Sequence, residues 1–281
     1  MSRIAIVTDS SSGLSAGLIA RYDLHVLPYY ILAGGRMLRD GIQISRDEVF
    51  RLLRDGRHLP NTKGPSQEDY AALYRSLLGK VDAVLVILPP RERTAAYQHA
   101  DSARRLIPDL PVTLLDARQT SAGQALVVLA AARARKAGGD LWAIAAAARQ
   151  AGERMEFWIV LESLKFAARS GRVPNIAQYI GSMVRPVPVL RHVDGAPHIA
   201  FTARSAERAI ERLKDELAGR VRGERVHAAI VHAGDAARAE SMRAWAQSTW
   251  PAIDCYVLEL PPVLAVYSGP GALGIAMYGE S

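Results

Sequence analysis

The sequence predicts an α/β protein with two domains, residues 1–155 and residues 156–281, that face each other across a cleft. In the first domain, short runs rich in Ile, Val and Leu alternate with helical segments, which favours a largely parallel sheet covered by helices. Beyond Phe157 the pattern changes and includes a hairpin with an Asp194-Gly195 turn, which favours a smaller, mixed sheet in the second domain.

The opening strand leads directly into a polar loop. Ile4–Val7 is a continuous apolar run of the kind that lies buried on both faces of a sheet. Hydroxyl groups follow, including Ser10 and Ser11, and Ser12 or Ser15 is placed to cap the helix that comes next. Because parallel α/β sheets bind ligands at the carboxyl ends of their strands, these serines are candidate ligand contacts. The simpler alternative is that they only cap a helix.

The rest of the first domain is expected to alternate in the same way. Ser45 with Glu48 forms a capping box, and Pro28 favours an edge position for the strand that contains it. Gly34-Gly35 is expected to form a hairpin turn, and residues 60–66 a loop between two prolines. Strands are expected over 24–32, 36–38, 83–88 and 111–115, and helices over 16–22, 45–55, 66–78, 95–106, 120–136 and 141–154.

The second domain is expected to combine the hairpin with further strands and helices. Strands are expected over 157–161, 186–193, 198–202, 226–232 and 253–259, and helices up to 170–172, over 205–218 and over 236–249. The closing segment contains Gly269-Pro270-Gly271-Ala272-Leu273-Gly274, which resembles a dinucleotide fingerprint without the acidic residue about 20 positions further on. We expect a rigid turn there, where a glycine backbone closely approaches a neighbouring element or a ligand.

Composition narrows the class of protein. The chain has 281 residues, of which 49% are hydrophobic, and one cysteine, Cys255, so no internal disulfide is possible. No apolar run is long enough to cross a bilayer, and the N-terminus does not resemble a signal peptide, so we expect a cytoplasmic protein without stable membrane insertion. The net charge of +7 is spread along helices rather than concentrated, so we expect no nucleic-acid partner.

Common catalytic motifs are weak or absent. Gly13-Leu14-Ser15-Ala16-Gly17 matches the nucleophile elbow of α/β hydrolases, but Ser15 comes well after the end of the strand. The sequence has no metal-ligand spacing and no phosphate-binding loop of the Gly-x-x-x-x-Gly-Lys-Ser/Thr type. We therefore expect no cofactor, and binding is favoured over catalysis.

Seven segments in a fixed order point to one family. They are Val7–Ser11, Asp40–Ser45, Asn61–Ser66, Ser121–Gly123, Leu164–Val173, the hairpin Pro188–Gly195 with Arg204 beyond it, and Gly269–Gly274. Together they resemble the DegV family of bacterial fatty-acid-binding proteins, which includes the carrier subunit of fatty acid kinase. The resemblance runs from one end of the chain to the other.

The resemblance implies a lipid carrier without chemistry of its own. It implies that one long-chain fatty acid lies in an apolar tunnel between the two domains, with its carboxylate held by hydroxyl groups at the mouth. It also implies that a separate, ATP-dependent fatty acid kinase subunit can act on the bound acid. By analogy, Arg172 and Arg204 neutralise a carboxylate or acyl phosphate, although each alone could equally be a solvated surface arginine.

Two positions depart from the family pattern. The head-group serine after the third strand is replaced by Arg91, with Thr94 the nearest hydroxyl, and the histidine before the closing glycines is replaced by Tyr267. Thr62 retains its hydroxyl, and we expect Arg91 to pair with the carboxylate. The candidate ligand contacts are thus Thr62, Arg91, Thr94, Ser10, Ser11, Ser121, Arg172, Arg204, Tyr267, Gly269 and Gly271.

Two other functions stay open at this point. One is an acyl or ester hydrolase that uses Ser15 as its nucleophile. The other is a regulatory protein whose cleft has changed its ligand, since Arg91 and Tyr267 alter the expected head-group chemistry.

Overall fold

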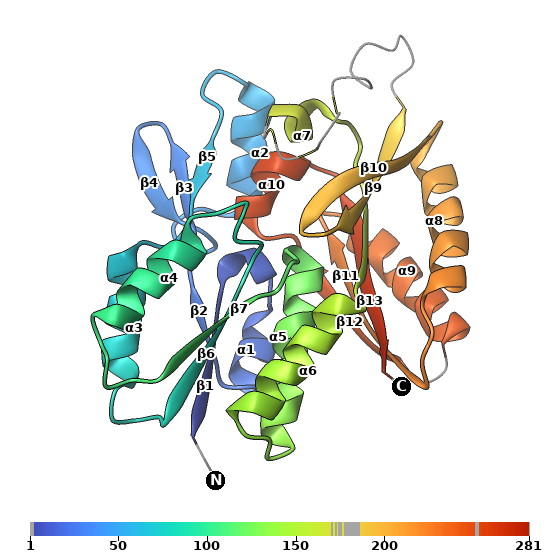
Figure 1. Ribbon diagram of the computed structural model, residues 1–281. Coiled ribbons are helices and arrows are strands. Elements are labelled where there is room, and N and C mark those ends of the chain that lie inside the picture. The colour runs from blue at the N-terminus through green and yellow to red at the C-terminus, as the bar shows by residue number, and fades with distance from the viewer. Residues whose placement is uncertain are drawn as a thin grey trace.

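The computed structural model describes residues 3–169, 171, 173, 176, 186–250 and 253–280. Within these ranges the chain forms a parallel sheet in the order β2-β1-β6-β7, a mixed sheet in the order β10-β9-β8-β13-β11-β12, and a small antiparallel sheet in the order β4-β3-β5 (Figure 1). The protein is therefore an α/β protein with a parallel N-terminal sheet and a mixed C-terminal sheet, as predicted.

The parallel sheet is buried on both faces, as its apolar runs predict. Ala5 and Val7 of β1 pack with Tyr70 and Tyr74 on one face, and Ile6 packs into the core on the other face. This alternation follows from the two-residue period of a strand. The strands are β1 (Ile4–Asp9), β2 (Leu24–Leu27), β6 (Ala83–Leu88) and β7 (Val112–Asp116), and the helices of this part are α1 (Ala16–Arg21), α3 (Gln67–Leu77), α4 (Ala96–Arg105), α5 (Ser121–Lys136) and α6 (Leu141–Glu153).

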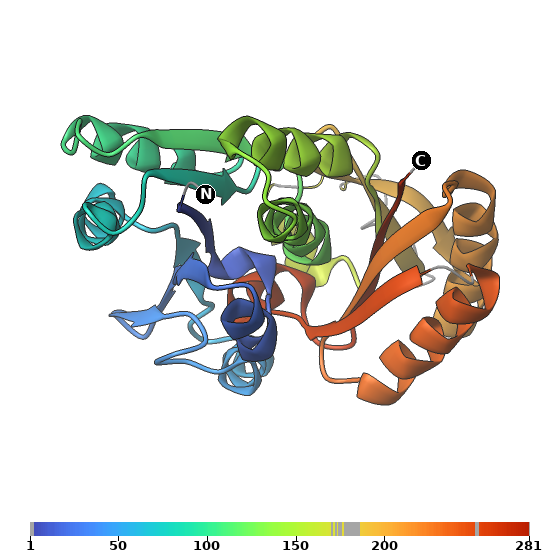
Figure 2. The same ribbon diagram turned by 90° about the horizontal axis from the view of Figure 1, so that it is seen from below.

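One helix, α5, lies between the parallel sheet and the mixed sheet. Seen from below, it occupies the space between them, and it contacts β1 and β6 on one side and β11 and β13 on the other (Figure 2). Every residue from Ser121 to Ala132 is buried. A helix that is apolar all round belongs inside a protein, which explains why this alanine-rich segment has no polar face over its first three turns.

Among the described residues the mixed sheet contains six strands and the parallel sheet four, so the C-terminal sheet is the larger of the two, and not the smaller one that the sequence led us to expect. Strand β13 (Leu273–Glu280) lies inside this sheet, antiparallel to β8 (Glu156–Val160) and β11 (Arg225–His232). The glycines at 274 and 279 hid this strand in the sequence, because glycine is rare in strand interiors. The other elements are β9 (Val187–Val193), β10 (Ala196–Ala203), β12 (Ile253–Glu259), α7 (Lys165–Arg169), α8 (Ala206–Arg220), α9 (Ala236–Thr249) and α10 (Pro262–Ser268).

The apolar run over 24–32 divides at Pro28 instead of forming one strand. After Pro28, the backbone N–H of Tyr29 donates to Ser10 Oγ at 3.0 Å, and its carbonyl accepts from Asp40 N at 2.8 Å. The chain thus leaves the parallel sheet and enters the small one, which also recruits residues expected to be loop. This sheet consists of β3 (Tyr30–Ala33), β4 (Arg36–Arg39) and β5 (Asn61–Lys63), and α2 (Arg46–Asp55) packs beside α10.

The part of the chain that the structure describes contains neither a membrane-spanning helix nor a cluster of metal ligands. No helix there has the length and apolarity needed to cross a membrane. Nor do three His, Cys, Asp or Glu side chains come together there in an arrangement that would hold a metal ion.

The closing glycine turn is packed too tightly for side chains. Gly269 has φ +72° and ψ −177°, a region that is essentially restricted to glycine. A Cβ atom at Gly269 would collide with the ring of Phe166, and one at Gly271 would collide with the carboxylate of Glu162. The close approach expected at this turn is therefore to neighbouring side chains, and neither glycine lines the main cavity.

Replacing Gly269 should destabilise the fold. We expect Gly269→Ala to cost about 1–3 kcal/mol of unfolding free energy, from backbone strain and displacement of Phe166. Gly17→Ala is the matched control, because Gly17 lies in α1 with open space around it, and alanine there should add about 0.5–1 kcal/mol. Chemical denaturation measures both, and equal effects would contradict the packing role.

Candidate functional site

A cavity of about 430 Å³ lies between the carboxyl ends of the parallel strands, helix α10 and strands β8 and β9. Figure 1 shows α10 beside α2 and α7 at this level of the molecule. The volume falls in the range of about 300–1,000 Å³ that is typical of small-molecule sites. Much of the wall is apolar: Ala167, Val173, Phe157, Ile159, Leu161, Leu190, Leu260, Val263 and Leu264.

Two hydroxyl groups from segments far apart in the sequence meet in the wall of this cavity. Thr62 of β5 and Tyr267 of α10 place their oxygens 2.5 Å apart. The Tyr267 hydroxyl also lies 3.4 Å from Asn61 Oδ1. The phenol that replaces the expected histidine thus lines the cavity and forms a hydrogen bond with Thr62.

A second hydroxyl pair lies next to the first. Tyr29 and Thr94 place their oxygens 3.0 Å apart, and Thr94 Oγ1 also accepts from Ala96 N at 3.2 Å. The backbone of Gly64, two residues after Thr62, passes so close that a Cβ atom there would lie 3.2 Å from Thr94 Oγ1. One region of the cavity wall therefore carries four hydroxyl groups.

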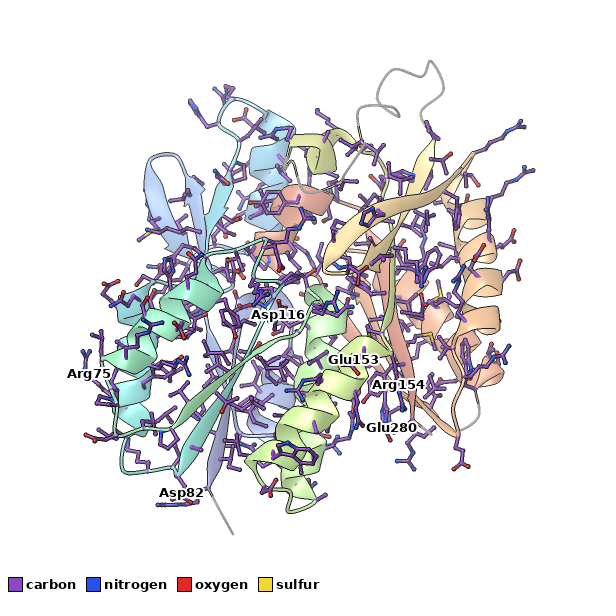
Figure 3. The ribbon with its side chains drawn as sticks, in the orientation of Figure 1. Arg75, Asp82, Asp116, Glu153, Arg154 and Glu280 are labelled. Carbon is purple, nitrogen blue, oxygen red and sulfur yellow. The ribbon has the colours of Figure 1, made fainter. Side chains whose placement is uncertain are left out.

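Arg91, which the sequence analysis places beside the carboxylate, lies outside the cavity. Arg91 is exposed, its Nε is 3.2 Å from Glu92 Oε1, and it borders a separate surface groove rather than the cavity. That groove also includes Asp116, at the carboxyl end of β7, and Glu153 of α6, both labelled in Figure 3. Among the described residues, the arginine that lines the cavity is Arg93, two residues further on.

Of the other two predicted arginines, one lies away from the cavity and one falls outside the described residues. Arg204 is exposed and follows β10, at the opposite end of the hairpin from the Asp194-Gly195 turn, whose Gly195 lines the cavity. Arg172 lies outside the described residues.

Ser10 supports the site from outside it. Its hydroxyl donates to Asp40 Oδ2 at 2.5 Å, and Asp40 Oδ1 accepts the N–H of Val263 at 2.9 Å. Burial raises the pKa of Asp40 to about 6, against the hydrogen bonds from Ser10 and Val263, which lower it. Asp40 thereby connects the loop after β1 to the beginning of α10, the helix that carries Tyr267.

Ser11 lines the cavity and belongs to a buried network. Asp9 Oδ1 accepts the backbone N–H of Ser11 at 3.0 Å, lies 2.5 Å from Ser11 Oγ, and accepts from Gln124 Nε2 at 3.3 Å. Its other oxygen, Oδ2, has no hydrogen-bond partner among the described residues. Burial raises the pKa of Asp9 to about 7, against the hydrogen bonds from Ser11 and Gln124, which lower it. The Asp9 side chain also caps the short turn Ser10–Ser12.

The remaining predicted residues divide between cavity and scaffold. Ser121, at the beginning of α5, lines the cavity. Ser15 accepts from Leu18 N at 3.3 Å as the cap of α1, and it does not line the cavity. Ser15, the nucleophile of the alternative hydrolase hypothesis, thus makes a structural contact outside the cavity.

Sequence reasoning missed Tyr29, Arg93 and His192, which all line the cavity. Tyr29 and Arg93 lie in loops, where no period predicts which side chains point inward. His192 carried a usable signal, because residues two apart on a strand share a face, and Leu190 precedes it by two on β9.

Comparison with known proteins agrees with the geometry. The model of a family described as "Uncharacterised protein, DegV family" matches residues 3–280. A DegV domain-containing protein of Caldanaerobacter subterraneus is 30% identical over 215 residues, 76% of each chain. One from Streptomyces coelicolor is 29% identical over 282 residues, 99% of each chain.

Solved structures share the fold. A fatty-acid-binding DegV family protein from Thermus thermophilus superposes with a TM-score of 0.92 at 29% identity, over 98% of this chain and 99% of that one. DegV of Bacillus subtilis, described as a fatty acid binding protein, gives a TM-score of 0.86 at 23% identity, over 99% of both chains, and shows the fold alone.

The buried Asp9 should make stability depend on pH. Its pKa of about 7 in the folded protein lies above the ordinary value of 3.8, so its contribution to stability is present at low pH and is lost as pH rises through about 7. From about pH 5 to about pH 8, wild type should lose about 3 kcal/mol of unfolding free energy relative to Asp9→Asn. Denaturation of both proteins across this range measures the difference, and parallel profiles would contradict the assignment.

Proposed function

The chain belongs to the DegV family, and we propose that it binds one long-chain fatty acid in the cavity between its parallel and mixed sheets. One observation carries the proposal: the cavity combines a mainly apolar wall with four hydroxyl groups gathered in one region. An amphiphilic acid matches both parts. The fatty-acid-binding relative from Thermus thermophilus, with its TM-score of 0.92, supports the same ligand class.

The apolar wall would supply most of the affinity. Each buried methylene is worth about 0.8 kcal/mol, so a chain of about 14 methylenes offers roughly 11 kcal/mol before the costs of association. A hydrogen bond to a charged group adds only about 1.5–3 kcal/mol. The tail would therefore determine how tightly the acid binds, and the hydroxyl groups would determine where its carboxylate lies.

Thr62, Tyr267, Thr94 and Tyr29 are the proposed head-group contacts, and Arg93 is the proposed cation. Arg93 takes this role in place of Arg91, because Arg93 lines the cavity whereas Arg91 lies beside Glu92 on the surface. Arg93 is half-buried, so its attraction for a carboxylate is only partly screened by solvent. Ser11 and Ser121 complete the polar wall.

We also propose that the protein acts as a carrier rather than as an enzyme. The head-group hydroxyls pair with one another, and His99 Nδ1 lies 2.8 Å from the carbonyl of Pro65 rather than beside a nucleophile. Such a site holds a carboxylate in a fixed position, which is what a separate ATP-dependent kinase would require of its substrate.

The first prediction from the proposed function concerns the purified protein. Organic extraction followed by mass spectrometry should yield close to one fatty acid per chain, and native mass spectrometry should show the same mass bound to the folded protein. A protein that carries no acid and also fails to take up added palmitate or oleate would contradict the proposed function.

The second prediction concerns the hydroxyl pair. Thr62→Val and Tyr267→Phe should each weaken binding of a fatty acid by about tenfold or more, because each removes a donor to the carboxylate. Ser76→Ala is a suitable control, since that exposed hydroxyl only donates to Leu73 O. Titration with a fluorescent fatty acid measures all three, and unchanged affinity in the Thr62 and Tyr267 variants would remove these residues from the site.

The third prediction separates the two neighbouring arginines. Arg93→Ala should weaken binding of the acid by about threefold to tenfold while leaving binding of its methyl ester nearly unchanged, because only the acid carries a charge. Arg91→Ala is the matched control and should affect neither ligand. A charge-dependent loss in Arg91→Ala instead would restore the assignment expected from the sequence.

A further inference from the structure

One buried carboxylate is linked to both hydroxyl pairs of the cavity wall. Asp40 directly follows β4, is 3% exposed and does not line the cavity. Its two oxygens bind two different segments: Oδ2 accepts the hydroxyl of Ser10 at 2.5 Å, and Oδ1 accepts the N–H of Val263 at 2.9 Å. Each of these bonds leads to one of the two tyrosines of the hydroxyl pairs.

The bond to Val263 caps the helix that carries Tyr267. Helix α10 has no side-chain cap of its own, because its N-cap is Pro261, and Pro262 has no N–H. The two residues after Val263 each donate to Pro261 O at 3.0 Å. Val263 is thus the residue of the first turn whose N–H needs an acceptor from outside the helix, and Asp40 supplies it. Tyr267 lies four residues further on, on the same face of α10.

Asp40 also ties α10 to the sheet that carries Thr62. Its own N–H donates to Tyr29 O at 2.8 Å, just before β3 begins. Strand β3 lies between β4, which ends at Asp40, and β5, which contains Thr62. The bond from Val263 to Asp40 therefore holds α10 against the small sheet, and it helps to fix how far Tyr267 lies from Thr62.

The bond to Ser10 leads to the second hydroxyl pair. Ser10 Oγ, which donates to Asp40, also accepts the N–H of Tyr29 at 3.0 Å. The backbone of Tyr29 is thus held at both of its polar groups, the N–H by Ser10 and the carbonyl by the N–H of Asp40. Its side-chain hydroxyl lies 3.0 Å from Thr94 Oγ1, so this pair depends on the same carboxylate.

A carboxylate suits a positioning role at this place. Hydrogen bonds to an ionised acceptor are shorter and roughly twice as strong as those between neutral groups. Burial raises the pKa of Asp40 to about 6, so the group is still mainly ionised near pH 7. A buried charge costs stability unless it is hydrogen-bonded, and both oxygens of Asp40 have partners.

We propose that Asp40 is the positioning residue of the head-group site: through Val263 and Ser10 it fixes the separation of the hydroxyl groups that receive the carboxylate. The proposal rests on the fatty-acid-binding function proposed above and adds a residue that acts on the ligand only through others. Asp40 should therefore affect the recognition of a charged head group more than the binding of the tail.

The experiment compares palmitic acid with methyl palmitate, by displacement of a fluorescent fatty acid. Both carry the same tail, but only the acid offers a charge to the hydroxyl groups. Asp40→Ala should lower the ratio of acid affinity to ester affinity by about threefold to tenfold. Asp40→Asn should lower it less, because asparagine can still accept from Val263 and donate to Ser10.

Ser12→Ala is the matched control. Ser12 lies in the same short turn as Ser10, but its hydroxyl donates to Asp9 O at 2.8 Å, and it does not line the cavity. This variant should leave the ratio unchanged.

Two further variants separate positioning from folding. Ser10→Ala keeps the bond between Asp40 and Val263 and removes the link to Tyr29, so it should lower the ratio even if Asp40→Ala does not fold. In a Tyr267→Phe background, Asp40→Ala should lower the ratio by less than it does in wild type, because one of the hydroxyl groups that it positions is absent.

Each other outcome overturns the proposal. Equal losses for acid and ester would make Asp40 a structural residue without a role in head-group recognition. An unchanged ratio in Ser10→Ala would contradict the link to Tyr29, and independent effects of Asp40→Ala and Tyr267→Phe would contradict the link through α10. If these variants bind the acid as wild type does while Tyr267→Phe weakens it, only this inference fails. If no acid binds at all, the proposed function fails as well.

Discussion

The burial of α5 between the two sheets is the constraint on which the rest of the structure depends. Its side chains belong to the apolar core on both sides, and the helix covers the face that the parallel sheet and the mixed sheet each turn toward it. It also makes polar contacts on both sides: Gln124 donates to Thr8 Oγ1 at 3.0 Å, and Arg133 bonds the hydroxyl of Tyr278 in β13. At the other end of the core, Arg135 donates to Ile4 O at 2.9 Å. The first residue of this helix, Ser121, forms part of the cavity wall, so the packing that joins the halves also positions the site.

The cavity is assembled from segments far apart in the sequence. Asp40, in the N-terminal half, holds the first turn of α10 through Val263, and the same helix places Tyr267 against Thr62. On the other side, the hairpin turn brings Gly195 against Pro90, with a Cβ-to-Cβ approach of 3.1 Å if Gly195 carried a side chain. Tight contacts of this kind leave little freedom in the shape of the cavity.

The sequence predicted features that depend on local chemistry. The capping box at Ser45 is present, and the apolar runs of β1 and β6 are fully buried strands. Thr62, Thr94 and Tyr267, which the sequence predicts as ligand contacts, line the cavity. Features that depend on distant contacts were missed: β13 pairs with strands far away in sequence, and Pro28 diverts the chain into another sheet. The sequence predicted Arg91 in the cavity, and the structure places Arg93 there instead. Loop geometry, and not residue type, decides which of two nearby arginines faces inward.

The hydroxyl pair formed by Thr62 and Tyr267 has a consequence for how the site changes between empty and occupied. One hydroxyl of the pair donates to the other, and the Tyr267 hydroxyl also lies 3.4 Å from Asn61 Oδ1. If a fatty acid binds as proposed, its carboxylate would accept from both hydroxyls, which exchanges neutral hydrogen bonds for two charge-assisted ones. Because two oxygens 2.5 Å apart repel once no proton lies between them, the two side chains would also have to move apart. Occupancy of the proposed head-group site would thus be recorded in the direction of two protons and in the distance between the Thr62 and Tyr267 oxygens, a difference visible to neutron diffraction or to hydroxyl proton resonances.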